Sequence, residues 1–302
     1  MYTKMLVPLD GSKTAEKVLP YARYLADKLK VSIELLAVID IAELATHITA
    51  ERARFLDTMI DEAMCSSEKY LRRVAATFGA ATVTCKIEQG RPEDVIIEQG
   101  KADTATLIAM ATHGRSGLNR FLLGSITEKV LRGAANPLLL VRATDEAKSD
   151  GEVGLKTILV PLDGSALAES ALPMAVGVAK KLGLEVTLFR AYHIPYNAYA
   201  GNDGYYGVNY DELISAVRDE AKEYLDKKVA EVKKLGVEAV SALAKEGFAS
   251  DEIISIGRKV PNALTAMSSH GRSGVKRWVL GSVTENVVRH SHNPVLIFRG
   301  SF

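Results

Sequence analysis

The sequence predicts an α/β protein made of two tandem open sheets of parallel strands, with helices on both faces of each sheet. Three observations lead to this fold class. One unit of about 150 residues occurs twice, and within it short apolar runs alternate with longer helical patterns. The apolar runs are also continuous, as expected for parallel strands that are buried on both faces.

The duplication is visible as four pairs of similar segments in the same order. The aspartates of the first pair lie 153 residues apart and the glycines of the second pair lie 157 apart, so the spacing drifts by only four residues. Two long units indicate a tandem domain rather than a solenoid. The paired segments are "LVPLDGS" at 6–12 and 159–165, "HGRSG" at 113–117 and 270–274, "LGSITEKVLR" at 123–132 with "LGSVTENVVR" at 280–289, and "NPLLLVR" at 136–142 with "NPVLIFR" at 293–299.

The junction between the copies, "ATDEAKSDGEVG", is charged, rich in small residues and lacks apolar periodicity, which is typical of a linker. We therefore predict a first domain at 1–143, a linker at 144–154 and a second domain at 155–302.

Each copy is expected to hold five strands, and the second repeats the element order of the first. Apolar runs in the first copy predict strands at 4–9, 32–39, 81–88, 105–111 and 137–142, and helical spacing predicts helices at 14–30, 52–78, 92–101 and 125–134. The copies differ most at 193–212, where five tyrosines stand among Gly and Asn. That segment is either a functional loop, such as a lid or an assembly contact, or a solvated excursion.

Composition limits the possible partners. The chain has 302 residues, is 47% hydrophobic and carries a net charge of +1, which favours neither nucleic acid nor an anionic membrane as a partner. No apolar run reaches the roughly 18 residues of a membrane helix, and no signal peptide is evident. Cys65 and Cys85 fit neither a disulfide framework nor a metal cluster. We expect a reduced, cytoplasmic protein.

Two motifs are expected to meet at the carboxyl edge of each sheet. Asp10 and Asp163 follow the first strand of each copy, and the "HGRSG" loops follow the fourth. Ligands of open α/β sheets bind at this edge, where the strand order reverses. Glycines allow backbone N–H groups to approach a ligand closely, and the helix start at Gly124-Ser125 offers the positive end of its dipole. These features suit the binding of a phosphate group, and the guanidinium of Arg115 can add two parallel hydrogen bonds to it.

Each motif also has an explanation that needs no ligand. Ser125-x-x-Glu128 and Ser282-x-x-Glu285 are possible capping boxes. Asp10 and Asp163 either hydrogen-bond a ribose or adenine edge or cap the next helix, unless the serine in "LDGS" takes the capping role. His113 and His270 either transfer protons or hydrogen-bond their own loops.

With these residues the chain resembles the universal stress protein family in its tandem form. The resemblance covers nearly the whole chain and rests on the "PLDGS" start, the Gly-x2-Gly-x9-Gly-Ser pattern near the fourth strand, and the final "NP-apolar" strand. It implies five-stranded parallel sheets of order 3-2-1-4-5, of the adenine nucleotide alpha hydrolase-like type. It also implies that the two final strands pair across a pseudo-dimer within the chain, and further homodimerisation is plausible.

In the ATP-binding branch of this family, matching positions hold an adenine nucleotide. Adenine and ribose would lie near the first two strands, and ribose and phosphates near the signature loop. The implied set in the first copy is Pro8, Asp10, Val38, Met110, His113, Gly114, Arg115, Gly124, Ser125 and Ile126, and in the second Pro161, Asp163, Ala191, Met267, His270, Gly271, Arg272, Gly281, Ser282 and Val283.

The chain departs from the family pattern where the first signature glycine is Ala111 in one copy and Ser268 in the other. If that position needs a positive φ, affinity falls, because neither residue tolerates it as glycine does. The resemblance implies a regulatory module that binds ATP, with or without Mg²⁺. The alternatives are a slow ATP hydrolase, although no Walker A lysine pattern is present, and an interaction scaffold that has lost nucleotide binding.

Overall fold

The computed structural model describes residues 2–46, 55–113, 123–142, 151–194, 210–260, 262–269 and 280–299. Five of the predicted site residues lie outside these ranges, as does most of the tyrosine-rich segment; those five are Gly114, Arg115, His270, Gly271 and Arg272. Contacts divide the chain into two compact units. The first comprises 1–154, 276–280 and 294–299, and the second 155–275, 281–293 and 300–302.

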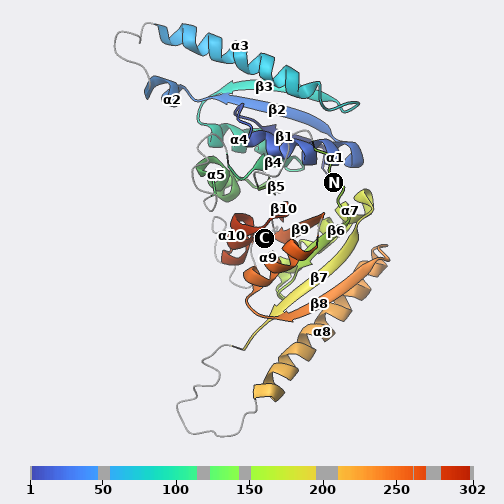
Figure 1. The fold of residues 1–302 in the computed structure, drawn as a ribbon. Coiled ribbons are helices and arrows are strands. Elements are labelled where there is room, and N and C mark those ends of the chain that lie inside the picture. Colours follow the sequence, from blue (N-terminus) through green and yellow to red (C-terminus); the bar gives the residue numbers. More distant parts are fainter. Residues whose placement is uncertain are drawn as a thin grey trace. The chain divides into compact units, whose positions relative to one another are not determined.

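The first unit is built on a parallel sheet of order β3-β2-β1-β4-β5 (Figure 1). This is the order 3-2-1-4-5 that the family resemblance implied. The apolar sequence "MLV" in the middle of β1 is fully buried, since strands lie on both sides of it. The strands are β1 (Lys4–Pro8), β2 (Ser32–Ile39), β3 (Val83–Gln89), β4 (Leu107–Ala111) and β5 (Leu138–Val141).

One strand from the end of the chain also belongs to the first unit. β10 (Val295–Phe298) pairs antiparallel with β5, with Val295 opposite Leu140 and Ile297 opposite Leu138. The two final "NP-apolar" strands therefore pair with each other, as the resemblance implied, and β5 is not an exposed edge.

Helices of the first unit connect the strands by crossovers. Right-handed crossovers place the helices after β1 and β2 on one face and those after β3 and β4 on the other. α3 packs along β2 and β3, while α4 and α5 pack against each other (Figure 1). The helical elements are the 3-10 helix η1 (Ala15–Val18), α1 (Leu19–Leu29), α2 (Ile41–Thr46), α3 (Leu56–Ala75), α4 (Pro92–Lys101) and α5 (Ser125–Gly133).

The second unit repeats this plan in four parallel strands of order β9-β6-β7-β8. Its helix α8 packs along β7 and β8, and α9 packs against α10. The strands are β6 (Thr157–Pro161), β7 (Glu185–Tyr192), β8 (Val240–Glu246) and β9 (Ala263–Ser268). The helices are α6 (Ala166–Glu169), α7 (Leu172–Leu182), α8 (Tyr210–Lys234), α9 (Ala249–Lys259) and α10 (Ser282–His290).

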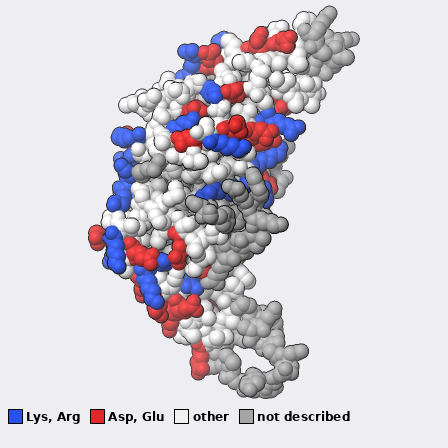
Figure 2. Space-filling view, turned by 180° about the vertical axis from the view of Figure 1, so that it is seen from behind, with Lys and Arg blue, Asp and Glu red and all other residues white. Residues whose placement is uncertain are grey.

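Acidic and basic side chains lie intermixed on the face shown in Figure 2. Among the described residues, no helix combines the length and the apolar character that crossing a membrane would require.

Candidate functional site

A tight turn follows the first strand of the first unit. After β1, the Leu9 N–H donates to the Leu36 carbonyl at 2.8 Å, which keeps the chain beside β2. Gly11 then adopts a φ of 78°, and the Ser12 N–H donates to Asp10 Oδ1 at 2.9 Å. Ser12 Oγ accepts from the Ala15 N–H at 3.0 Å. The serine thus accepts from the start of the next helix and the aspartate holds the turn, so Asp10 is not the helix cap.

The second unit builds the same turn from the same letters. Gly164 has a φ of 85°, and Asp163 Oδ1 accepts from both the N–H and the hydroxyl of Ser165, at 2.9 and 2.6 Å. Ser165 Oγ accepts from the Ala168 N–H at 3.1 Å and caps α6. In both units a carboxylate is therefore fixed at the carboxyl edge of the sheet without being used as a helix cap.

The helix that follows the signature loop begins with an N-cap glycine. Gly124 is the N-cap residue of α5 and Gly281 that of α10, and within the described part of the chain no side chain makes a capping hydrogen bond to either helix. Ser125 and Ser282 are already the first helical residues, so the capping-box alternative is wrong in both copies. The reason is positional, because a capping serine must precede the helix. Glu128 and Glu285, the expected partners, instead pair with arginines one turn later.

Hydrogen bonds close each loop at its base. The Gly124 N–H donates to the Thr112 carbonyl at 2.8 Å, and the Thr127 hydroxyl donates to the Ala111 carbonyl at 3.0 Å. In the second unit the corresponding bonds run from Gly281 to Ser269 and from Thr284 to Ser268, both at 3.0 Å. The N-terminus of the helix is therefore held at the carboxyl end of the fourth strand, and the two ends of the loop lie next to each other.

Ala111 and Ser268, which replace the first signature glycine, end β4 and β9. Both are buried in strand conformation, and neither has a positive φ. The conformational penalty anticipated for a residue other than glycine therefore does not arise at this position.

His113 is half-buried beside the loop base. Its Nδ1 lies 3.0 Å from the Thr112 hydroxyl, and its buried Nε2 has no hydrogen-bond partner among the described residues. Burial, with a smaller effect from Arg142, lowers the pKa of the imidazole, which is consequently neutral at pH 7. Its described hydrogen bond, with Thr112, lies within its own loop. This is the second of the two roles considered for His113, the first being proton transfer.

The remaining predicted residues lie at or near the same sheet edge in each unit. The register Leu6↔Ile108 brings the ends of β1 and β4, with Pro8 and Met110, to one level. Met110 and Met267 are buried at the ends of their strands, and Val38 and Ala191 are half-buried near the ends of β2 and β7. The described members of the set are Pro8, Asp10, Val38, Met110, His113, Gly124, Ser125 and Ile126, and Pro161, Asp163, Ala191, Met267, Gly281, Ser282 and Val283.

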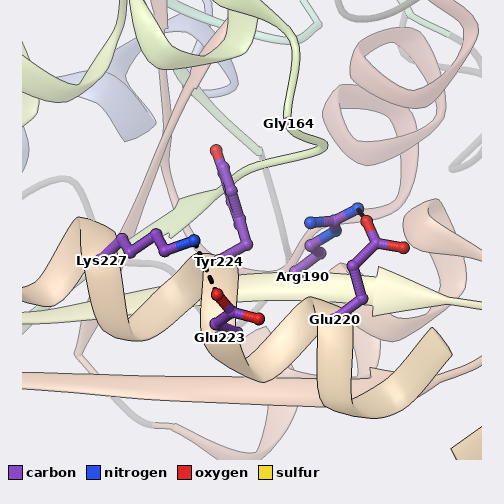
Figure 3. A pocket seen from close by; sticks show the side chains of 6 residues that line it. All are labelled: Gly164, Arg190, Glu220, Glu223, Tyr224 and Lys227. Atoms are coloured by element: carbon purple, nitrogen blue, oxygen red, sulfur yellow. Dashed lines mark hydrogen bonds and ion pairs between the residues drawn. The ribbon is translucent and has the colours of Figure 1, made fainter. Parts of the chain in front are cut away.

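One feature of the second unit was not predicted, a groove of about 350 Å³ beside the Asp163 turn (Figure 3). Arg190 of β7 lies at its side, only 9% exposed. Its guanidinium donates to Glu220 at 3.2 Å and lies 4.7 Å from the centre of the Tyr224 ring. An arginine inside the otherwise apolar strand "VTLFRAY" was the available sequence signal. The groove is lined by Gly164, Arg190, Glu220, Glu223, Tyr224 and Lys227.

The Tyr224 hydroxyl links this groove to the last residue of α6, Glu169. It donates to Glu169 at 2.8 Å, and the other oxygen of Glu169 accepts from Lys228 at 2.9 Å. Burial and Glu169 strongly raise the pKa of Tyr224, and the charge of Asp163 contributes. Because every cation in this network has a carboxylate partner, it is a self-contained ionic network.

The first unit has the counterpart tyrosine, Tyr70, but its buried hydroxyl has no hydrogen-bond partner among the described residues. Burial and the charges of Glu16 and Asp10 raise the pKa of Tyr70. The register against the first strand makes Ala37 the counterpart of Arg190, since Leu36 and Phe189 both lie opposite the strand-ending proline. Among the described residues of the chain, no group of three side chains is arranged to hold a metal ion.

These features define a class of protein. The chain is a duplicated α/β protein in which each copy aims an uncapped helix N-terminus and a turn-held aspartate at the carboxyl edge of a parallel sheet. Such an edge is the usual ligand-binding edge of open α/β folds.

Comparison with known proteins gives the family. The sequence profile of the universal stress protein family matches residues 1–142 and again 154–299, so the chain belongs to this family as a tandem of two such domains. The crystal structure of a universal stress protein from Archaeoglobus fulgidus superposes with a TM-score of 0.70 at 25% identity, covering 99% of each chain.

Sequence relatives agree. A universal stress protein of Mycolicibacterium smegmatis is 24% identical over 98% of this chain and 96% of its own. The universal stress protein MJ0531 of Methanocaldococcus jannaschii is 28% identical over 47% of this chain and 83% of its own.

Proposed function

We propose that each unit binds an adenine nucleotide, with ATP as the expected ligand, and that the protein acts as a cytoplasmic regulatory module. The observation that carries this proposal is the uncapped N-terminus of α5 and α10, tied to the end of the fourth strand. Ser125 and Ser282 are exposed there, so the first-turn N–H groups and the positive end of the helix dipole face outward. A phosphate group suits such a position.

The turn after the first strand supplies the second half of the proposed site. Asp10 and Asp163 stand at the same sheet edge, where a carboxylate is suited to accept hydrogen bonds from ribose hydroxyls. Pro8, Val38 and Met110, with Pro161, Ala191 and Met267, would provide the apolar surroundings of the base and sugar. The ordinary strand conformation of Ala111 and Ser268 supports binding over a scaffold that has lost the ligand.

Regulation by occupancy is favoured over hydrolysis by the state of His113. Its imidazole is neutral and hydrogen-bonded to Thr112, which suits a loop-stabilising role. Exposed free thiols at Cys65 and Cys85 fit the reducing cytoplasm. Pairing of β5 with β10 supports an intramolecular pseudo-dimer. Further association of whole chains into homodimers would be measured by light scattering.

The first test uses substitutions that leave the helix stable but repel phosphate. Aspartate in the first turn of a helix interacts favourably with the dipole, so Ser125→Asp and Ser282→Asp should fold normally. The same carboxylate opposes a bound phosphate, and we expect each change to weaken ATP at its own unit by about tenfold or more. Ser125→Ala and Ser282→Ala keep the backbone N–H groups and add no charge, so they serve as controls and should weaken ATP less than the aspartates do.

The measurement is calorimetric titration with ATP, with and without Mg²⁺, together with mass spectrometry of whatever the denatured wild-type protein releases. Two sites are expected in wild type, with one of them weakened in each single variant and both weakened in the double variant. No released nucleotide and no heat with wild type would overturn the proposal. Steady phosphate release during the titration would show that the bound nucleotide is hydrolysed.

A further inference from the structure

A second groove in the second unit lies between α9 and α10, apart from the candidate nucleotide site. Its volume is about 470 Å³. Arg258 and Lys259 are exposed in the last turn of α9, and neither has an ion-pair partner among the described residues. Ile254 contributes an apolar wall. The lining residues are Asp251, Ile254, Ser255, Arg258, Lys259, Asn286 and His290.

The first unit provides the reference for this groove, because α4 and α5 occupy the same place there. The offset of 157 residues makes Glu98 the counterpart of Ser255 and Glu93 the counterpart of Ser250. In the first unit Glu93 pairs with Lys129 at 2.6 Å and Glu98 pairs with Lys101 at 3.4 Å. Every lysine of that helix pair is therefore neutralised by a neighbouring acid.

The second unit has lost both acids and one of the two lysines, since Asn286 is the counterpart of Lys129, and it has gained one new cation. Serines replace Glu93 and Glu98, Arg258 replaces Lys101, and Lys259 stands where the first unit has Ala102. Among the described residues that line the groove, Asp251 is the one carboxylate, and it accepts a hydrogen bond from the Ser250 hydroxyl at 3.3 Å. Across these positions the first unit has three acids and two lysines, whereas the second has one acid and two cations, with His290 in addition.

The shape of the groove has changed together with its charge. In the first unit Gly133 lies so close to Ile97 that an added Cβ would be 2.7 Å from the isoleucine Cδ1, so α4 and α5 leave no space at this point. The counterpart of Gly133 is His290, which lines the groove together with Ile254. A closed helix contact with a surplus of one acid in the first unit is thus an open groove with a surplus of one cation in the second.

We propose that this α9–α10 groove binds the phosphate group of a small phosphorylated molecule. Arg258 and Lys259 supply charge-assisted hydrogen bonds, and the Ser255 hydroxyl can donate to a further phosphate oxygen. The Asn286 amide nitrogen already donates to Ser250 Oγ at 3.0 Å, which leaves its second N–H for the phosphate. The groove is larger than a bare phosphate, and Ile254 provides contact for the organic part of a phosphate monoester. This site is independent of the nucleotide proposal, because it uses none of the same residues.

Glycerol 3-phosphate is the probe for the test, and amide NMR of the full chain is the measurement. Amides at 253–260 report this groove, whereas those at 124–128 report the nucleotide edge of the first unit, so binding at the two places is resolved. We expect saturable shifts at 253–260. Sodium chloride at matched ionic strength is the reference for general screening.

Ser255→Glu is the decisive variant, because it restores the acid that α4 carries at the same position and gives Arg258 a partner one turn away. It keeps both cations, and the fold accepts it in the first unit. We expect it to weaken the probe by about tenfold or more, as should the double change Arg258→Ala with Lys259→Ala. Lys101→Ala in the first unit is the matched control and should have no effect.

Absent shifts at 253–260, equal shifts with sodium chloride, or undiminished binding in Ser255→Glu would each overturn the proposal. Saturable binding that both groove variants weaken and Lys101→Ala leaves intact would establish it.

Discussion

The two units agree where hydrogen bonds fix the backbone and differ where side chains face solvent or line a groove. The Asp-Gly-Ser turn and the threonine bond to the fourth strand recur with nearly the same distances. In contrast, Arg190 of the second unit stands at the position of Ala37 in the first, and the α4–α5 contact differs in charge from α9–α10. The framework of the candidate site is thus shared, while the surroundings of the two sites have diverged.

The largest effect is expected from placing the second unit's arginine in the first. Ala37 is 5% exposed, and the residue corresponding to Glu220 is Ser66, so Ala37→Arg buries a guanidinium without its carboxylate. We expect the free energy of unfolding to fall by about 3 kcal/mol or more. Urea unfolding of wild type and the variant measures this loss of stability.

Two further variants test the cause of that loss. Adding Ser66→Glu should recover part of the stability, since it restores the missing partner. The converse change, Arg190→Ala, should cost only about 1–2 kcal/mol, because it removes a ring contact and an ion pair whose carboxylate is exposed, and it leaves Glu220 in solvent. If Ala37→Arg and Arg190→Ala lowered the free energy of unfolding by the same amount, this explanation would be wrong.

A smaller difference is expected at a helix glycine that both units share. In the first unit a Cβ on Gly100 would lie 2.6 Å from Oδ1 of Asn136, which is 1% exposed and donates to the carbonyls of Gly100, Asp103 and Thr106. Gly100→Ala should therefore cost about 1–3 kcal/mol through overpacking.

At Gly257 the nearest atom to an added Cβ is the half-buried Asn293 amide nitrogen, at 3.3 Å. The helix propensity of alanine offsets a small shift of that side chain, so Gly257→Ala should change stability by no more than about 0.5 kcal/mol. Thermal melts of the two variants compare the units directly, and equal destabilisation would show that the asparagines are packed alike.

The smallest expected effect concerns pH. The folded-state pKa of His113 lies below the ordinary value of about 6.5 because burial disfavours the charged ring. Below pH 6.5 the unfolded chain then binds more protons than the folded one, so this residue lowers stability as the pH falls. His113→Gln should lose less melting temperature between pH 7.5 and 5.5 than wild type. A larger loss in the variant would mean that the folded state prefers the charged ring.

Much of the fold was predictable because apolar periodicity is a local property of the sequence. The strand at 32–39 and the helix at 92–101 have the predicted ends. The duplication and the strand order, the latter taken from the family resemblance, are also confirmed. The helix predicted at 14–30 is divided into the 3-10 helix η1 and the α-helix α1, and the short helix α2 was not predicted, since it lacks a full apolar face.

Less of the site was predictable, because its hydrogen bonds depend on where each helix begins. The sequence allowed Ser125 to be an N-cap, but the helix begins one residue earlier than that reading requires. The groove near Arg190 depends on residues more than 50 positions apart, such as Glu169 and Tyr224.

The hydrogen bond between Gly124 and Thr112 has a practical consequence for protein engineering. It holds the two ends of the signature loop together independently of the loop's own length, and the entropic cost of a longer loop rises only slowly with added residues. A short peptide tag or a fluorescent reporter inserted between these ends would leave α5 anchored to β4 by Thr127. The equivalent insertion before Gly281 would label the second unit separately. Two different reporters would then follow the two units within one molecule.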